Sequence, residues 1–182
     1  MKPVLPFLPE RPLKPRNSGL TMVMDKGLSI REAEDFMSVG SEYTDLVKLG
    51  FGTSLITPGF EKKIEIYKKW GVIPYFGGTL FEAFIIRDMF REFIEFLDRY
   101  EVEMVEVSDG SYDIDHSQKL EYIRTLAGRG KVISEVGSKK KEVVYTPDQW
   151  VAMMKSELDA GSVKVIAEAR ESGTTGIYNE DG

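Results

Sequence analysis

The pattern that most constrains the fold of this chain is a short apolar run that ends in charged residues and glycine. In the segment 162–176, SVKVIAEARESGTTG, the apolar residues Val163, Val165 and Ile166 lead directly into charges and a glycine-rich turn. The other four instances read TMVMDKG, DLVKLGFG, VEVSDG and VISEVGSKK. A buried strand that delivers charge at its carboxyl end is typical of α/β proteins whose active site lies at the strand ends.

The spacing of these runs predicts how the units are connected. Six strands are predicted, over 20–24, 45–49, 72–76, 103–107, 131–135 and 163–166. Their starts lie about 30 residues apart, which is the size of one strand-plus-helix unit. No GxGxxG follows the first strand and no Walker A pattern occurs. Six such units in series therefore favour a (β/α)₈ barrel of the TIM type over a doubly wound sheet.

Helix starts are marked by capping residues between the predicted strands. Ser29 is an expected N-cap, and Thr57-Pro58 and Thr146-Pro147 each combine a cap with proline at the first helical position. Pro74 falls inside the predicted strand 72–76 and removes a ladder hydrogen bond there, which makes this strand the weakest of the six.

The number of units falls short of a closed barrel. A (β/α)₈ barrel has eight units over roughly 250 residues, whereas this sequence of 182 residues contains about six. We expect a proline-rich arm over 1–18 and a barrel domain over 19–182 that lacks the last two units. Open edge strands tend to aggregate unless they are covered, so the interpretation is a truncated product or a sequence that omits further chain.

The arm carries a proline at every third position. These prolines are Pro3, Pro6, Pro9, Pro12 and Pro15. A period of three is the repeat of a polyproline II helix, which serves as a ligand of proline-recognition modules or as an extended segment. We expect an extended arm that lies on its own domain or on a neighbouring subunit.

Composition excludes several classes of function. The chain has 42% hydrophobic and 30% charged residues, which is typical of a globular protein. The absence of cysteine excludes disulfides, thiolate catalysis and cysteine-ligated zinc. A net charge of −6 argues against a nucleic-acid surface. Neither a secretory signal nor an apolar run of about 18 residues is found, and we expect a cytoplasmic protein without membrane partners.

Two kinds of charge gather at the predicted strand ends. The cations are Lys26, Lys48, Lys139, Lys140 and Arg170, and the carboxylates are Asp25, Glu106, Asp109, Glu135, Glu168 and Glu171. Lys and Arg suit phosphate and carboxylate ligands, and carboxylates suit Mg²⁺. The alternative interpretation of any one of these residues is that it belongs to a structural ion pair. His116, the only histidine, is expected at a helix start as a surface or capping residue, so a Ser-His-Asp triad is not supported.

Taken together, the strand-end motifs resemble those of phosphosulfolactate synthases. The motifs run in order from about residue 19 to 176: Asp25-Lys26-Gly27, Lys48 with 50–53, the segment 77–82 (GGTLFE), 106–110 (EVSDG), 135–137 (EVG), and Glu168 with 170–173 (RESG). The resemblance implies a (β/α)₈ barrel, a carbon–sulfur lyase that requires Mg²⁺, and addition of sulfite to phosphoenolpyruvate. The implied product is (2R)-2-O-phospho-3-sulfolactate, which leads to coenzyme M in methanogens and to sulfolactate in some bacteria. We also expect a homo-oligomer.

The resemblance also implies roles for individual residues. Lys139 is expected to protonate C2, with Arg170 as a second catalytic and binding cation. Lys26, Lys48 and Arg170 are expected to hold phosphate, carboxylate or sulfite. Glu106, Asp109 and Glu135 are the expected Mg²⁺ ligands.

This chain departs from the family pattern in three ways. Ser138 stands where a lysine is common, the segment 74–76 (PYF) precedes the double glycine, and the last two units are missing. Two other functions remain open from sequence. One is a non-catalytic relative of the heat-stress-associated type, and the other is a different Mg²⁺-dependent barrel enzyme that acts on carboxylates.

Overall fold

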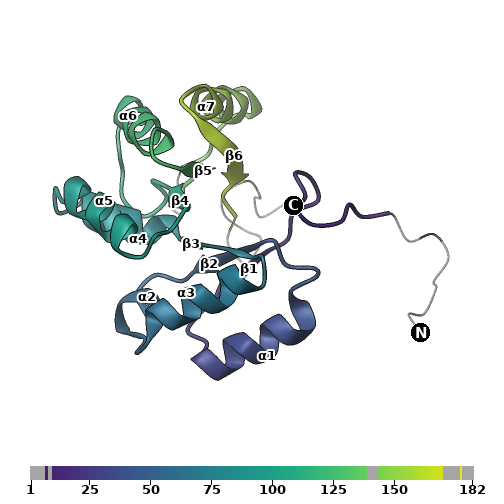
Figure 1. Cartoon of the computed structure of the whole chain (residues 1–182). Helices are drawn as coiled ribbons and strands as arrows, with labels where there is room; N and C mark the ends of the chain where they lie inside the picture. The colour runs from purple at the N-terminus through teal and green to yellow at the C-terminus, as the bar shows by residue number, and fades with distance from the viewer. Residues whose placement is uncertain (1–6, 8–9, 139–142, 170–176, 178–182) are drawn as a thin grey trace.

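A computed structural model describes residues 7, 10–138, 143–169 and 177. Its centre is one parallel sheet of six strands in the order β1-β2-β3-β4-β5-β6, each beside its neighbour in sequence. The strands are β1 (Met22–Asp25), β2 (Leu46–Leu49), β3 (Ile73–Phe76), β4 (Met104–Val107), β5 (Lys131–Val136) and β6 (Ser162–Ala167). The sheet is curled, and all six predicted strands are confirmed within one or two residues (Figure 1).

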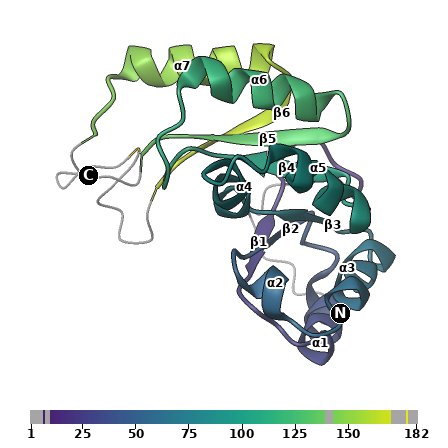
Figure 2. The same cartoon turned by 90° about the vertical axis from the view of Figure 1, so that its left-hand side faces the viewer.

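Helices connect the strands and lie in an arc outside the sheet, as the two perpendicular views show (Figures 1 and 2). They are α1 (Ile30–Gly40), α2 (Thr53–Ile56), α3 (Phe60–Lys69), α4 (Gly78–Ile85), α5 (Phe90–Arg99), α6 (His116–Ala127) and α7 (Pro147–Asp159). Strands that follow one another in a parallel sheet need such crossover connections. The described residues thus form a parallel α/β half-barrel, consistent with the TIM-barrel type.

The predicted helix caps are confirmed at two of three positions. Ser29 and Thr146 each form a capping box, with Glu32 and Gln149 respectively, at the starts of α1 and α7. The prediction for Thr57-Pro58 is wrong. Thr57 ends α2, where its hydroxyl donates to the Thr53 carbonyl at 2.6 Å, and α3 begins only at Phe60.

Pro74 lies inside β3 as predicted, and the pairing explains how the sheet accommodates it. The Ile73 amide donates to Asp45 and the Gly77 amide to Leu49, so odd-numbered amides of β3 point to β2. The missing N–H of Pro74 therefore faces β4. On that side the ladder is reduced to Phe76 opposite Val105, whereas the pairing with β2 runs the whole length of β3.

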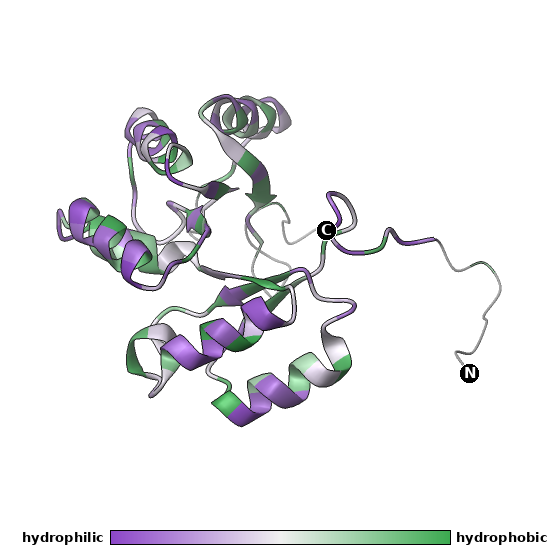
Figure 3. Ribbon diagram, in the orientation of Figure 1, coloured by the Kyte–Doolittle hydropathy of each residue, from purple (hydrophilic) through white to green (hydrophobic). Residues whose placement is uncertain are grey.

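Alternation along the strands separates two apolar layers. The residues that face the helices belong to the main core, for example Val47, Val105 and Val132. The other face is concave and carries a smaller cluster of Leu46, Tyr75, Met104 and Ile133. Figure 3 shows that the surrounding helices carry both hydrophobic and hydrophilic residues, as expected for helices with one side on this core.

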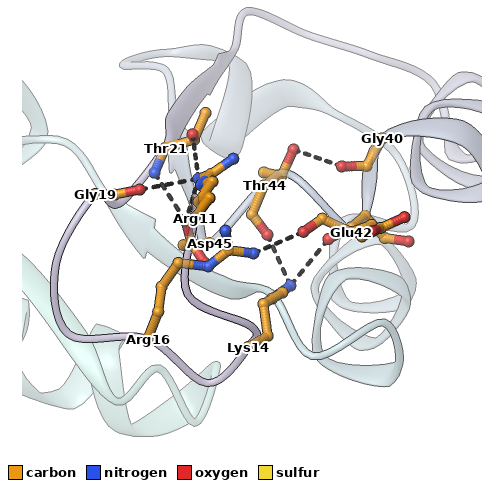
Figure 4. A network of polar contacts seen from close by, with 10 residues as sticks. Arg11, Lys14, Arg16, Gly19, Thr21, Gly40, Glu42, Thr44 and Asp45 are labelled. Carbon is orange, nitrogen blue, oxygen red and sulfur yellow. Dashed lines mark hydrogen bonds and ion pairs between the residues drawn. The ribbon is translucent and has the colours of Figure 1, made fainter. Parts of the chain in front are cut away.

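The described part of the N-terminal arm is attached to its own domain at the start of β2. Arg11 Nη2 and Arg16 Nε lie 3.1 and 2.9 Å from the carboxylate oxygens of Asp45. Lys14 donates to the carbonyls of Ser41 and Thr44 at 3.0 and 2.7 Å (Figure 4). The prolines before residue 10 lie outside the described residues. None of the helices described here has the length and apolar character needed to cross a membrane.

Candidate active site

Three charged residues of the sheet form a cluster on its concave face. Alternation places Lys48 of β2, Glu106 of β4 and Glu135 of β5 on this face, one layer above the apolar cluster and towards the strand ends. Lys48 Nζ lies 2.6 Å from Glu106 Oε1 and 3.5 Å from Glu135 Oε2. Three predicted site residues from three strands are therefore brought together around one ammonium group.

Burial and charge act in opposite directions in this cluster. Burial raises the pKa of Glu106, which is 1% exposed, and Lys48 offsets this effect only in part. Burial alone would lower the pKa of Lys48, but the two carboxylates outweigh it and raise that pKa. The buried Tyr75 lies in the layer below, and burial followed by the negative charge of Glu106 raises the pKa of its phenol. The charged ammonium form of Lys48 is thus favoured, and it can pair with an anion.

The two glycines after β3 have no side chain, and the space beside them is occupied by this cluster. A Cβ on Gly77 would lie 2.8 Å from Lys48 Cε. A Cβ on Gly78 would lie 2.6 Å from Ser108 Cβ and 3.0 Å from Glu106 Oε1. The Gly78 amide instead donates to Glu106 Oε1 at 2.7 Å, at the start of α4. Close approach of the backbone is therefore the physical reason for two glycines at these positions.

A cavity of about 360 Å³ opens over Lys48 and Glu135 of this cluster. Lys48, Glu135, Gly77, Thr79, Phe51 and Glu168 are among the residues that line it, and they come from strand ends and the loops that follow. Lys26 is exposed in the loop after β1 and borders a separate cavity with Gly27 and Glu32. A cavity of about 380 Å³ at the opposite ends of the strands is lined by the arm and lacks these glutamates.

Asp109 is part of a different ion-pair cluster. Its Oδ1 accepts from Lys119 Nζ at 2.8 Å, behind the sheet. Within the ranges described, no three acidic, histidine or cysteine side chains are grouped as metal ligands. The structure therefore brings Glu106 and Glu135 together, but it does not bring Asp109 into one ligand set with them.

The donor chemistry of the concave cluster fits Mg²⁺ in type. Magnesium in proteins usually takes one or two carboxylates and keeps several waters. Glu106 Oε2 is buried and makes no hydrogen bond within the described part of the chain. Two carboxylates against one ammonium formally leave one negative charge. Glu106 and Glu135 are thus the side chains that would hold the ion, beside Lys48.

Two predicted site residues, Lys139 and Arg170, lie outside the described residues. His116 is the first residue of α6, where its Nε2 lies 2.8 Å from the hydroxyl of Ser156 on α7. The predicted position of His116 at a helix start is confirmed.

Several buried polar residues next to the site were given no role from the sequence, although Glu82 belongs to the GGTLFE motif. Lys119 and Glu157 form an ion pair at 2.7 Å behind β5. Glu82 of α4 accepts from the amides of Ser111 and Tyr112 at 2.8 and 2.7 Å, and thereby fixes the loop after β4. The available signal was a charged residue on the apolar side of a helix, as at Lys119, which shares its side with Ile123 and Leu126.

A curled parallel α/β half-barrel with a charged cavity at the carboxyl ends of its strands is consistent with the class of TIM-barrel-type proteins, whose sites lie at those ends. The fold agrees with that of 3-hexulose-6-phosphate synthase, which matches 84% of this chain and 66% of its own with a TM-score of 0.51 and 20% identity. At that level of identity the likeness shows the fold alone.

Sequence comparison identifies the family. The family described as (2R)-phospho-3-sulfolactate synthase (ComA) matches residues 9–182. A phosphosulfolactate synthase of Bacillus subtilis is 37% identical over 177 residues, covering 96% of this chain and 70% of the relative. One of Methanocaldococcus jannaschii is 39% identical over 170 residues, covering 90% and 68%. The chain belongs to the phosphosulfolactate synthase family and spans about 70% of the length of these relatives.

Proposed function

We propose that this protein is a phosphosulfolactate synthase, a carbon–sulfur lyase that adds sulfite to phosphoenolpyruvate to give (2R)-2-O-phospho-3-sulfolactate. The observation that carries the proposal is the cluster of Lys48, Glu106 and Glu135 beneath a strand-end cavity, in a chain of this family. A complete (β/α)₈ barrel is part of the proposal, because the relatives are longer than this chain.

The reaction makes one carbon–sulfur bond and needs one proton. The sulfur of sulfite attacks C3 of phosphoenolpyruvate, and the electrons of the C2–C3 double bond move towards the substrate carboxylate. A proton then adds to C2, so that a single bond remains between C2 and C3. The groups required are cations that hold the anionic substrates, stabilisation for the carboxylate charge, and a proton donor.

The residues of the cluster supply the first two requirements. The Lys48 ammonium holds a substrate anion at the floor of the cavity, where burial strengthens the attraction. Glu106 and Glu135 are the side chains that would hold Mg²⁺, and the Gly78 amide keeps Glu106 in place. When bound, Mg²⁺ neutralises the charge that develops on the substrate carboxylate.

The remaining roles are assigned by family resemblance. Lys139 donates the proton to C2, and Arg170 together with Lys26 holds further anionic groups. For a general acid, Lys139→Ala lowers turnover by roughly 10²–10⁴-fold, whereas loss of a binding cation mainly raises the Michaelis constant.

An omission experiment tests this function. Phosphorus NMR follows phosphoenolpyruvate in the complete protein with sulfite and Mg²⁺, without sulfite, and with Mg²⁺ removed by chelation. We expect phosphoenolpyruvate to be consumed, and a new phosphate-ester signal to appear, only when sulfite and Mg²⁺ are both present. Consumption without sulfite would favour another Mg²⁺-dependent barrel enzyme. No consumption by the folded protein would favour a non-catalytic relative of the heat-stress-associated type.

A further inference from the structure

Lys119 of α6 is a buried lysine behind the sheet for which the reaction outlined above has no role. Its side chain is 1% exposed. Its ammonium contacts three acceptors: Asp109 Oδ1 at 2.8 Å, Glu157 Oε1 at 2.7 Å and the backbone carbonyl of Glu135 at 2.6 Å. A lysine is rarely buried this completely unless it is paired, and here all three ammonium hydrogens have an acceptor.

The contact between the Lys119 ammonium and the Glu135 carbonyl is explained by the position at which the pairing of β4 with β5 ends. The Glu168 amide donates to the Val136 carbonyl, so that carbonyl points to β6. Successive carbonyls alternate along a strand, which directs the Glu135 carbonyl towards β4. The β4–β5 ladder ends with Val107 opposite Ser134, one residue earlier. The Lys119 ammonium takes the carbonyl at the position where β4 no longer supplies a partner.

Glu135 is therefore held from both faces of the sheet. On the concave face its carboxylate lies 3.5 Å from Lys48 Nζ, and on the helix face its carbonyl is bound by Lys119. Asp109, at the end of β4, is held by the same ammonium. One buried cation thus fixes the relative position of the β4 and β5 ends, from which Glu106 and Glu135 extend.

We propose that Lys119 is a positioning residue of the active site, which sets the place of the Glu135 carboxylate by binding its backbone carbonyl and Asp109. The inference rests on the proposed function for its effect on turnover, but not for its effect on the backbone. Groups that orient metal-binding or catalytic side chains typically change affinity or activity by roughly 10–100-fold when they are removed.

The test uses a double variant, because Lys119→Met alone leaves the buried Glu157 and the partly exposed Asp109 without their cation. Lys119→Met with Glu157→Met removes the ion pair in favour of apolar side chains of similar length, a replacement that proteins often tolerate. Glu157→Gln is the matched control, since it keeps the ammonium on Asp109 and on the Glu135 carbonyl. Lys155→Met, on the exposed side of α7, controls for loss of a lysine.

Two measurements decide the proposal. Hydrogen exchange of the peptide that covers the end of β5 is expected to become roughly tenfold faster or more in the double variant, but not in Glu157→Gln. At saturating substrates, turnover is expected to fall by roughly 10–100-fold while the Michaelis constant for phosphoenolpyruvate changes little. Hydrogen exchange and turnover are both measured under conditions in which urea titration has shown that every variant is folded.

Unchanged exchange at the end of β5, or unchanged turnover in an active double variant, overturns the proposal. If the unaltered protein itself shows no synthase activity, the proposed function fails. The exchange result then still decides whether Lys119 positions Glu135.

Discussion

Lys48 and Lys119 are two lysines that have the same kinds of partner and lie on opposite faces of one sheet. Each ammonium contacts two carboxylates, and each contacts Glu135, through its side chain or its carbonyl. Lys48 is 16% exposed beneath a cavity, whereas Lys119 is 1% exposed between sheet and helices. The face of the sheet, and not the set of charges, therefore decides whether such a cluster can bind a ligand.

The largest effect is expected from Lys119→Ala on stability. Removing one partner of a buried ion pair typically costs about 3–5 kcal/mol, because the remaining charges lose their compensation. Here Asp109 and Glu157 would lose it together. Urea unfolding followed by tryptophan fluorescence measures the change. Lys155→Ala on the exposed side of α7 is expected to stay within about 0.5 kcal/mol, and equal effects of the two would contradict the account.

A smaller effect is expected from Gly77→Ala, which tests how tightly Lys48 is enclosed. The φ angle of Gly77 is −69°, so the added methyl group causes no backbone strain. Its Cβ would however lie 2.8 Å from Lys48 Cε, and overpacking of this kind costs about 1–3 kcal/mol. Urea titration and the Michaelis constant for phosphoenolpyruvate are both expected to change. Gly128→Ala, where the added Cβ meets its nearest atom at 3.4 Å, is the control.

The smallest expected effect is a pH dependence of stability that arises from the buried cluster around Asp25, which contacts Lys63 and Tyr67. Burial raises the pKa of Asp25, but hydrogen bonds from Lys63, Gly27, Tyr67 and Leu28 outweigh it and lower the pKa below its ordinary value of 3.8. A carboxyl group whose pKa is lower in the folded than in the unfolded protein stabilises the fold at pH values above its unfolded-state pKa. This stabilisation is lost as the pH falls through its folded-state pKa.

The stability difference between the unaltered protein and Asp25→Asn is therefore expected to shrink below about pH 4. Urea titrations across that range measure it. A difference that stays constant or grows in acid would show that Asp25 is not held as an anion by this cluster.

Sequence periodicity was sufficient for the six strands, because a buried parallel strand is a continuous apolar run with a clear end. Local capping signals were less reliable. Thr146-Pro147 begins α7, but the same pair at Thr57-Pro58 follows α2 without beginning a helix. In the second case the chain first makes a separate turn, and Gly59 in the left-handed region starts α3. A cap is a local preference, and the surrounding chain decides whether it is used.

For the site, strand ends identified Lys48, Glu106 and Glu135 as neighbours, since alternation along parallel strands places them on one face. Asp109 follows β4 just as closely in sequence, yet it pairs with Lys119 from α6. That partner depends on how a helix packs behind the sheet, which no strand-end motif encodes. Lys63 and Lys119 were missed for the same reason, although each lies among buried residues of its helix.

The most direct test of the concave cluster as the substrate site is the affinity of the complete protein for phosphoenolpyruvate, measured by isothermal titration calorimetry with Mg²⁺ present. Lys48→Met keeps the length of the side chain and removes its charge. A hydrogen bond to a charged group contributes about 1.5–3 kcal/mol, so binding is expected to weaken by roughly 10–100-fold. Lys155→Met is expected to bind as the unaltered protein does. Equal affinity of Lys48→Met and the unaltered protein would contradict the assignment of this cluster as the substrate site.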